Sequence, residues 1–128
     1  MPVEIKGFPI QHYFEIVYTG TVTGADQSAA LQKGMPLVKH GMPLILTNTI
    51  EIEGVPPVDE VFQQLIHPLE QLALPAEMKE AILLPRDPRW AEHVLFYEAA
   101  CRNRGLQVQS FTDREKAMAW LLENSGIC

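Results

Sequence analysis

Residues 81–90 of the chain, Ala-Ile-Leu-Leu-Pro-Arg-Asp-Pro-Arg-Trp, predict a strand that is followed at once by a helix. Residues 81–84 form a continuous apolar run, which is typical of a strand covered by helices on both faces of a sheet. Pro85 ends that strand. Asp87 is a favoured N-cap residue and Pro88 suits the first helical position, so the helix is expected to begin at Pro88. This strand-to-helix order decides the fold class.

The same order is repeated on both sides of this stretch. Further strands are predicted at residues 3–6, 13–22, 44–46 and 106–109, and further helices at residues 24–39, 58–73 and from 113 onward. Thr23 with Asp26, and Thr112 with Glu115, are expected to cap two of these helices. Strands that alternate with helices imply right-handed crossovers and parallel neighbours. The predicted fold is α/β, with a five-stranded mixed, mainly parallel sheet, flanking helices and an antiparallel first strand at one edge.

Two prolines interrupt the predicted helices. Pro36 should kink the first helix, because proline lacks an N–H and its ring crowds the preceding turn. Pro68 should kink or break the 58–73 helix near His67. Such a kink can leave a gap between this helix and the sheet.

The length and composition are those of one soluble domain. The chain has 128 residues, of which 47% are hydrophobic and 20% are charged. These values exclude a disordered chain. A chain of this length builds one core, so we expect a single domain over residues 1–128 and exclude most two-domain enzymes.

Charge and hydropathy narrow the class of partner. Ten Lys and Arg against sixteen Asp and Glu give a net charge of −6, which argues against nucleic acid and anionic membranes as partners. No apolar run approaches the ~18 residues of a membrane helix and no signal peptide precedes the fold, so we expect no membrane insertion and a cytoplasmic location. Cys101 is expected in the core, and Cys128 is expected to be a free thiol.

No strong catalytic or metal-binding motif is present. The four histidines are scattered, whereas metal ligands must converge, so we expect neither a metal nor a cofactor. Glu51 and Glu53 would share a face of an extended chain, and paired carboxylates can act as acid and base. Their apolar neighbours favour a plain exposed edge instead, and no catalytic residue is assigned.

One candidate ligand site lies where the strands are expected to end. In open α/β sheets, ligands bind at the carboxyl ends of strands, and a helix N-terminus favours anions. Arg86 and Arg89 flank the helix start there, while Thr23 and Asn48 follow other strands that end at the same rim. These four residues are the candidate set for binding a small anion, although Asp87 at the helix start opposes one.

A second candidate site is an apolar surface. The 88–104 helix is apolar on more than one side, and Phe96 is large for a solvated face. Such a surface suits a contact between two copies of the chain or a pocket for an apolar ligand, while burial against a neighbouring helix is the alternative. The candidate interaction surface consists of four residues: Asp59, Phe62, Trp90 and Phe96.

Three stretches are similar to a known family. Residues 79–84 resemble its central strand, and residues 88–90 resemble the opening of its next helix. Residues 107–121 resemble its strand, phenylalanine, acidic cap and Ala-x-Ala-Trp-Leu helix. With the initial hairpin and first helix, the chain thus resembles the SpoIIAA-like (STAS-like) family of small bacterial proteins, which is related to anti-sigma-factor antagonist domains.

This resemblance implies a mixed sheet flanked by helices and a regulatory role, because the related domains bind a kinase or a sigma-factor regulator. Their switch is a serine at a helix start, which becomes phosphorylated. The matching stretch, residues 53–60, holds no Ser or Thr, and Asp59 places a fixed negative charge at the helix start. The phosphorylatable serine is therefore missing from the expected position.

Three functions are left open. The first is a non-enzymatic regulatory or interaction module that forms a homodimer or binds a regulatory protein. The second is a carrier of a small apolar or lipid-like ligand, held in a cavity beneath the 58–73 helix. The third is an enzyme with its site at the carboxyl rim of the sheet, where Arg86 and Asn48 would orient a substrate.

Overall fold

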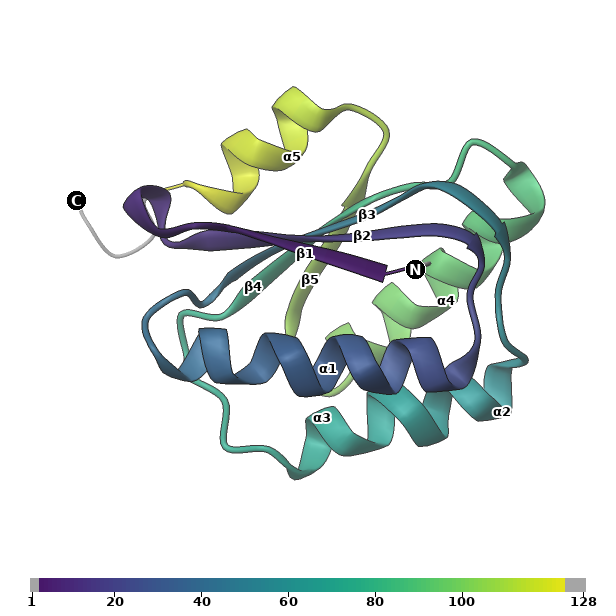
Figure 1. Cartoon of the computed structure of the whole chain (residues 1–128), viewed down its shortest axis with the longest axis horizontal. Coiled ribbons are helices and arrows are strands. Elements are labelled where there is room, and N and C mark those ends of the chain that lie inside the picture. Colours follow the sequence, from purple (N-terminus) through teal and green to yellow (C-terminus); the bar gives the residue numbers. More distant parts are fainter. Residues whose placement is uncertain (1–2, 124–128) are drawn as a thin grey trace.

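Five strands form one sheet in the order in which they occur along the chain (Figure 1). The computed structural model describes residues 3–123, so Cys128 lies outside the described residues. The strands are β1 (Val3–Phe8), β2 (Tyr13–Thr21), β3 (Leu44–Gly54), β4 (Lys79–Leu83) and β5 (Gln107–Phe111). The helices are η1 (Pro9–Gln11), α1 (Gly24–Lys39), α2 (Val58–Val61), η2 (Phe62–Ile66), α3 (His67–Gln71), α4 (Pro88–Arg102) and α5 (Arg114–Leu121).

The sheet is mixed and mainly parallel, as predicted. β1 pairs antiparallel with β2 at one edge, and β2, β3, β4 and β5 are parallel. Right-handed crossovers between strands that are added in one direction place all connecting helices on the same face. Because α5 follows the last strand, no such crossover constrains it.

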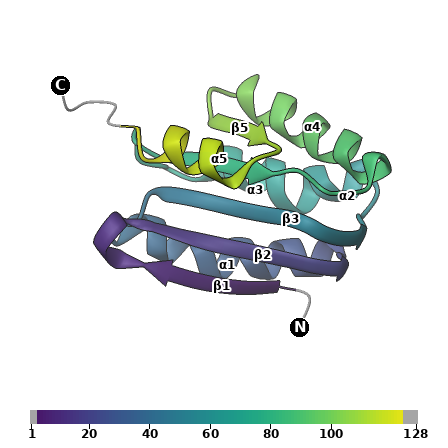
Figure 2. The same ribbon diagram turned by 90° about the horizontal axis from the view of Figure 1, so that it is seen from above.

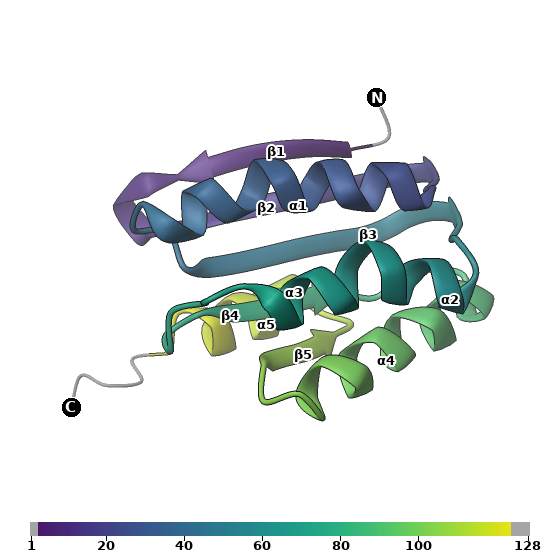
Figure 3. The same ribbon diagram turned by 90° about the horizontal axis from the view of Figure 1, so that it is seen from below.

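The two faces of the sheet are covered unequally. α1, α4 and the helical run from α2 to α3 lie on one face, and α5 lies on the other (Figures 1 and 3). α5 contacts β3, β4 and β5, and Figure 2 shows β1 and β2 without a helix above them. We call these sides the three-helix face and the α5 face.

The alternation along β2 divides the core between these faces. Phe14, Ile16 and Tyr18 are buried on the three-helix face, and Tyr13 is buried on the α5 face. This is the period of two that the sequence predicted for the strand. Cys101 of α4 is fully buried, which confirms its place in the core.

Most elements differ from their predicted bounds by one or two residues, and the end of β3 and the cap of α5 differ for identifiable reasons. β3 extends to Gly54, far beyond residues 44–46, because its polar side chains find partners in the sheet; Thr49 Oγ1 donates to a β4 carbonyl oxygen at 2.6 Å. The cap of α5 is Asp113 rather than Thr112, since the Asp113 carboxylate accepts a backbone N–H of the first turn at 2.9 Å.

The predicted break at Pro68 is a wide helical turn instead. The backbone stays helical through His67, with φ −62° and ψ −47°, and η2 is one turn of π-helix in which the His67 N–H donates to the Phe62 carbonyl. This wider turn relieves the crowding between the proline ring and the carbonyl four residues earlier. The run from α2 through η2 to α3, residues 58–71, therefore continues across the sheet as one segment, which we call the α2–α3 segment.

Candidate functional site

A cavity of about 100 Å³ lies between the sheet and the helices of the three-helix face. Residues of β2, β3 and β4 form the wall on the side of the sheet. Residues of α1, the α2–α3 segment and α4 form the opposite walls. Val61, Leu65 and Leu69 line it from the α2–α3 segment, where the carrier hypothesis predicted a gap. Other apolar lining residues include Ile16, Val22, Ala30, Ile45, Ile82 and Val94.

Small residues on α1 control how closely this helix approaches the sheet. Ala30 and Gly34 lie one turn apart on its buried side, and both line the cavity. A Cβ atom on Gly34 would lie 3.2 Å from Cε2 of Phe14, so the missing side chain lets the helix rest close to that ring. Beside this contact, the short side chain of Ala30 leaves part of the interior unfilled.

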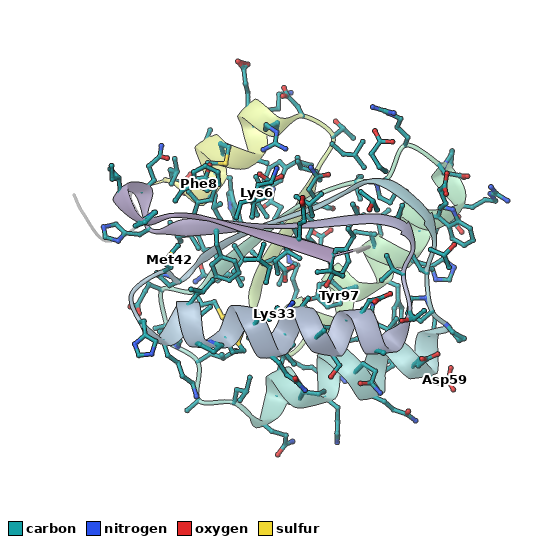
Figure 4. All side chains as sticks on the ribbon, in the orientation of Figure 1. Lys6, Phe8, Lys33, Met42, Asp59 and Tyr97 are labelled. Carbon is teal, nitrogen blue, oxygen red and sulfur yellow. The ribbon has the colours of Figure 1, made fainter. Side chains whose placement is uncertain are left out.

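One wall of the cavity is polar, and Glu80 of β4 is at its centre. Thr47 Oγ1 donates to Glu80 Oε2 at 2.5 Å, and the Tyr97 hydroxyl donates to Oε1 at 2.8 Å. Figure 4 shows Tyr97 between the sheet and the helices. Burial raises the pKa of Glu80, and the two hydrogen bonds oppose that rise only in part. The carboxyl group therefore favours its neutral form more than an exposed glutamate does.

The neighbours of Glu80 are held neutral as well. Burial, assisted by the charge of Glu80, raises the pKa of the Tyr18 and Tyr97 hydroxyls. The same two causes raise the pKa of the Cys101 thiol to about 12. Because the thiolate is the reactive form of cysteine, this thiol is no nucleophile at neutral pH. The polar wall can hydrogen-bond a ligand, but it supplies no activated nucleophile.

A second polar atom faces the same interior from α1. Gln27 lines the cavity, and its side-chain oxygen Oε1 is buried without a hydrogen-bond partner among the described residues. A buried acceptor that is left unpaired costs free energy. A ligand that donates a hydrogen bond would satisfy this atom.

The strand-end rim holds a separate surface cleft of about 370 Å³. Arg86, Asp87 and Arg89 line it together with Glu51 and Glu53 of β3. Both arginines have acidic partners, since Arg86 Nη1 lies 2.8 Å from Glu51 Oε2 and Arg89 Nη2 lies 2.6 Å from Asp87 Oδ2. The hydrogen bonds from Arg89 lower the pKa of Asp87. Since the carboxylates outnumber the guanidinium groups, the net charge of the cleft opposes an anion.

Thr23 and Asn48 do not line this cleft. Thr23 caps α1, where its Oγ1 accepts the Asp26 N–H and the Asp26 carboxylate accepts the Thr23 N–H. Asn48 points to the α5 face and donates from Nδ2 to Glu15 Oε2 at 3.1 Å. Of the four candidate ligand-binding residues, the structure brings together only the two arginines.

The four residues of the candidate interaction surface are also divided. Phe62 of η2 and Phe96 of α4 pack edge to face, with ring centroids 5.6 Å apart. Asp59 is exposed in the first turn of α2, at the outer end of that helix in Figure 4. Trp90 packs against the core of the three-helix face, and the guanidinium of Arg89 lies over its ring. Phe62 and Phe96 therefore form one apolar contact, and Trp90 belongs to the rim cleft.

The described residues form neither a metal centre nor a membrane-spanning helix. Within residues 3–123, no group of three or more His, Cys, Asp or Glu side chains is arranged to hold a metal ion. In the same part of the chain, no helix has both the length and the apolar character needed to cross a bilayer.

Sequence reasoning missed the polar wall. Glu80 directly precedes the apolar run at 81–84, and an acidic residue in a strand that is covered on both faces is the signal that could have found it. Its partners were harder to find, because Thr47 and Tyr97 approach it only after β3 pairs with β4 and α4 packs beneath the sheet.

Comparison with known proteins identifies the fold. The chain matches the crystal structure of an uncharacterized protein from the DUF3478 family, with a SpoIIAA-like fold, from Shewanella loihica PV-4. The TM-score is 0.54 and the sequence identity is 18%, over 93% of this chain and 91% of that chain. No protein-family model and no curated protein sequence matches the chain. The fold is therefore SpoIIAA-like, as the sequence resemblance predicted, and a likeness at this identity carries no statement about activity.

Proposed function

We propose that this protein binds a small apolar ligand in the cavity of the three-helix face. The observation that carries the proposal is the cavity of about 100 Å³ between the sheet, α1 and the α2–α3 segment. Its walls are mostly apolar, and a few polar groups converge on one side. This combination is typical of sites for small molecules.

Space that the packed side chains leave unfilled lowers the stability of the fold, because the atoms around it lack van der Waals partners. Domains have a total stability of only about 5–15 kcal/mol. A ligand that fills the space restores the missing contacts, so its binding also stabilises the folded protein.

The volume sets the size of the ligand. Because an engineered apolar cavity of about 150 Å³ in another protein holds benzene, this cavity suits a molecule of about four heavy atoms. Met35 and Met78 line the cavity, and their flexible side chains can adapt to the shape of the ligand. At about 1 kcal/mol per heavy atom, we expect a dissociation constant of about 1 mM.

Xenon and n-propanol test this proposal, because both are small enough for the cavity. We expect each to shift the amide resonances of residues that line the cavity in ¹H–¹⁵N spectra. Ala30→Leu adds three carbon atoms inside the cavity and should abolish these shifts. Ala25→Leu makes the same change on the exposed side of α1 and should leave them unchanged. Shifts that survive in Ala30→Leu, or no shifts in the native chain, would refute the proposal.

We propose self-association through α4 as a second function, because one exposed face of this helix is complementary to itself. Leu95 and Phe96 are 46% and 36% exposed in its middle. Glu92 lies toward one end of the face and Arg102 toward the other, and both are exposed. If two copies cross antiparallel near Phe96, each Glu92 meets the partner's Arg102 around an apolar centre. A two-fold symmetric contact needs this arrangement.

A further inference from the structure

We infer that the cavity of the three-helix face selects a cation, namely a small alkylammonium ion whose N–H groups donate to Glu80. This inference rests on the proposed function, because it names the ligand class of the same cavity. It depends on three features of the cavity. Its buried oxygens can accept more hydrogen bonds, no cation of the described residues pairs with Glu80, and the walls opposite Glu80 are apolar.

The side-chain oxygens of Gln27 and Glu80 in the cavity can accept further hydrogen bonds. Gln27 Oε1 is a buried acceptor without a partner among the described residues. Each Glu80 oxygen accepts one hydroxyl, from Thr47 or Tyr97, and a carboxylate oxygen can accept a second hydrogen bond. In its carboxylate form Glu80 has no hydrogen to donate, so a ketone or an ether could not pair with it. A ligand with several N–H donors can satisfy these oxygens.

No cation of the protein balances Glu80. Among residues 3–123, no lysine or arginine lines the cavity and no salt bridge reaches this carboxylate. Its neighbour Lys79 points to the α5 face, where Nζ donates to the Trp120 carbonyl at 2.8 Å. His93 lines the cavity, but it forms no ion pair with Glu80 within 4.0 Å. A carboxyl group in such a setting either keeps a proton or pairs with a charged ligand.

The remaining walls fit the alkyl part of such a ligand. Opposite the Glu80 strand, the α2–α3 segment contributes Val61, Leu65 and Leu69, which offer only apolar contacts. An alkyl chain of three carbons with one ammonium group has the four heavy atoms that the volume admits. Glu80 pairs with the ammonium ion as its carboxylate, so the occupied cavity carries no net charge.

Titration with propylammonium chloride and n-propanol at constant pH tests the inference, because the two probes differ only in the charged head. We expect propylammonium to bind the native chain about tenfold more tightly than n-propanol, since hydrogen bonds to charged groups are the stronger ones. Glu80→Gln should remove this preference while n-propanol still binds. Glu53→Gln removes an exposed carboxylate outside the cavity and should leave the preference intact.

The outcomes separate this inference from the proposed function. Equal affinity for the two probes, or a preference that persists in Glu80→Gln, would overturn the cation inference alone. Xenon shifts without any binding of propylammonium would have the same meaning. If neither probe nor xenon binds, the proposed function and the inference both fail. If Glu80→Gln does not fold, the relative affinity of the native chain for propylammonium and n-propanol still tests the preference for a cation.

Discussion

The guanidinium group of Arg114 donates two hydrogen bonds to the carboxylate of Glu15, from Nη2 to Oε2 at 3.0 Å and from Nη1 to Oε1 at 3.2 Å. Arg114 opens α5 and Glu15 lies on β2, 99 residues away in the sequence. The Glu15 side chain is 8% exposed, whereas that of Arg114 is 50% exposed. This pair therefore ties the start of α5 to the half of the sheet that the helix does not cover.

Arg114→Ala should lower the free energy of unfolding by about 1–3 kcal/mol, because it leaves a buried carboxylate with Asn48 as its remaining side-chain partner. The exposed side of Arg114 keeps the loss below that of a fully buried pair. Urea unfolding at neutral pH measures this loss of unfolding free energy. Arg86→Ala breaks an exposed ion pair with Glu51 and should cost less than about 0.5 kcal/mol. Equal costs for the two variants would contradict the assignment.

The same pair predicts a dependence of stability on pH. Burial alone would raise the pKa of Glu15, but the hydrogen bonds from Arg114 and Asn48 and the charge of Arg114 outweigh it, so the pKa lies below 4.5. An acid whose pKa is lower in the folded state stabilises the fold above its unfolded pKa and loses this contribution as the pH falls through the folded value. Below pH 4.5, the native chain should therefore lose more unfolding free energy than Arg114→Ala, as urea titrations at several pH values would show. Parallel curves would exclude this role.

Glu80→Gln should raise the melting temperature at neutral pH. The pKa of Glu80 is raised in the folded state, so the folded chain holds this proton more tightly than the unfolded chain. Stability is then lost as the pH rises from the unfolded value of 4.5 through the folded pKa. The amide of glutamine has no such titration, so the gain should vanish below pH 4.5.

Thermal melts of ligand-free protein at several pH values measure this gain. Glu53→Gln, an exposed carboxylate on β3, is the matched control and should shift the melting temperature little at any pH. A gain of the same size at all pH values would mean that the variant acts through packing.

Gly105→Ala should cost about 1 kcal/mol, because Gly105 has φ +82°, where a Cβ atom is strained. Gly105 lies in the turn that follows α4, and its N–H donates to the Arg102 carbonyl at 3.0 Å. Gly7→Ala is the control, since Gly7 lies in β1 without a positive φ and a Cβ there would make only an ordinary contact at 3.4 Å. Urea unfolding of both variants should show the loss at Gly105 only.

Exchange of charges tests self-association through α4. Arg102→Glu alone should weaken the dimer by placing like charges together, and Arg102→Glu combined with Glu92→Arg should restore it. Phe96→Ser should give a monomer, while Ile10→Ser, at a site that is 93% exposed on η1, should not. Sedimentation velocity over a range of concentrations measures all four. A dimer that persists unchanged in both Arg102→Glu and Phe96→Ser would refute this contact. A native chain that stays monomeric would refute it as well.

The fold was predictable because its signals are local. The apolar run at 81–84, the cap at Asp87 and the alternation along β2 each depend on neighbours within a few residues. Boundaries were less predictable where a distant partner decided them. β3 continues past Thr49 because that hydroxyl finds a carbonyl oxygen on β4, and the turn before Pro68 widens without breaking.

The four predicted ligand-binding residues were placed correctly only where they are neighbours in the sequence. Arg86 and Arg89 were correctly placed at one rim because they are neighbours in the sequence, whereas Thr23 and Asn48 turned away to a helix cap and to the opposite face. Asn48 lies in the middle of β3 and not at its end, because the strand continues to Gly54, and Thr23 is used as the N-cap of α1. The sequence prediction therefore identified the rim but misjudged its membership.

The sequence by itself determined the order of elements, the parallel sheet and the class of the fold, since periodicity, capping and crossover handedness act over short stretches of chain. Only the tertiary structure decided that Glu80 meets Thr47, that Arg114 meets Glu15 and that a cavity of about 100 Å³ lies beneath β3. Those pairs join residues 33 and 99 positions apart. The cavity is what the packed side chains fail to fill, and this volume exists only when every element is in place.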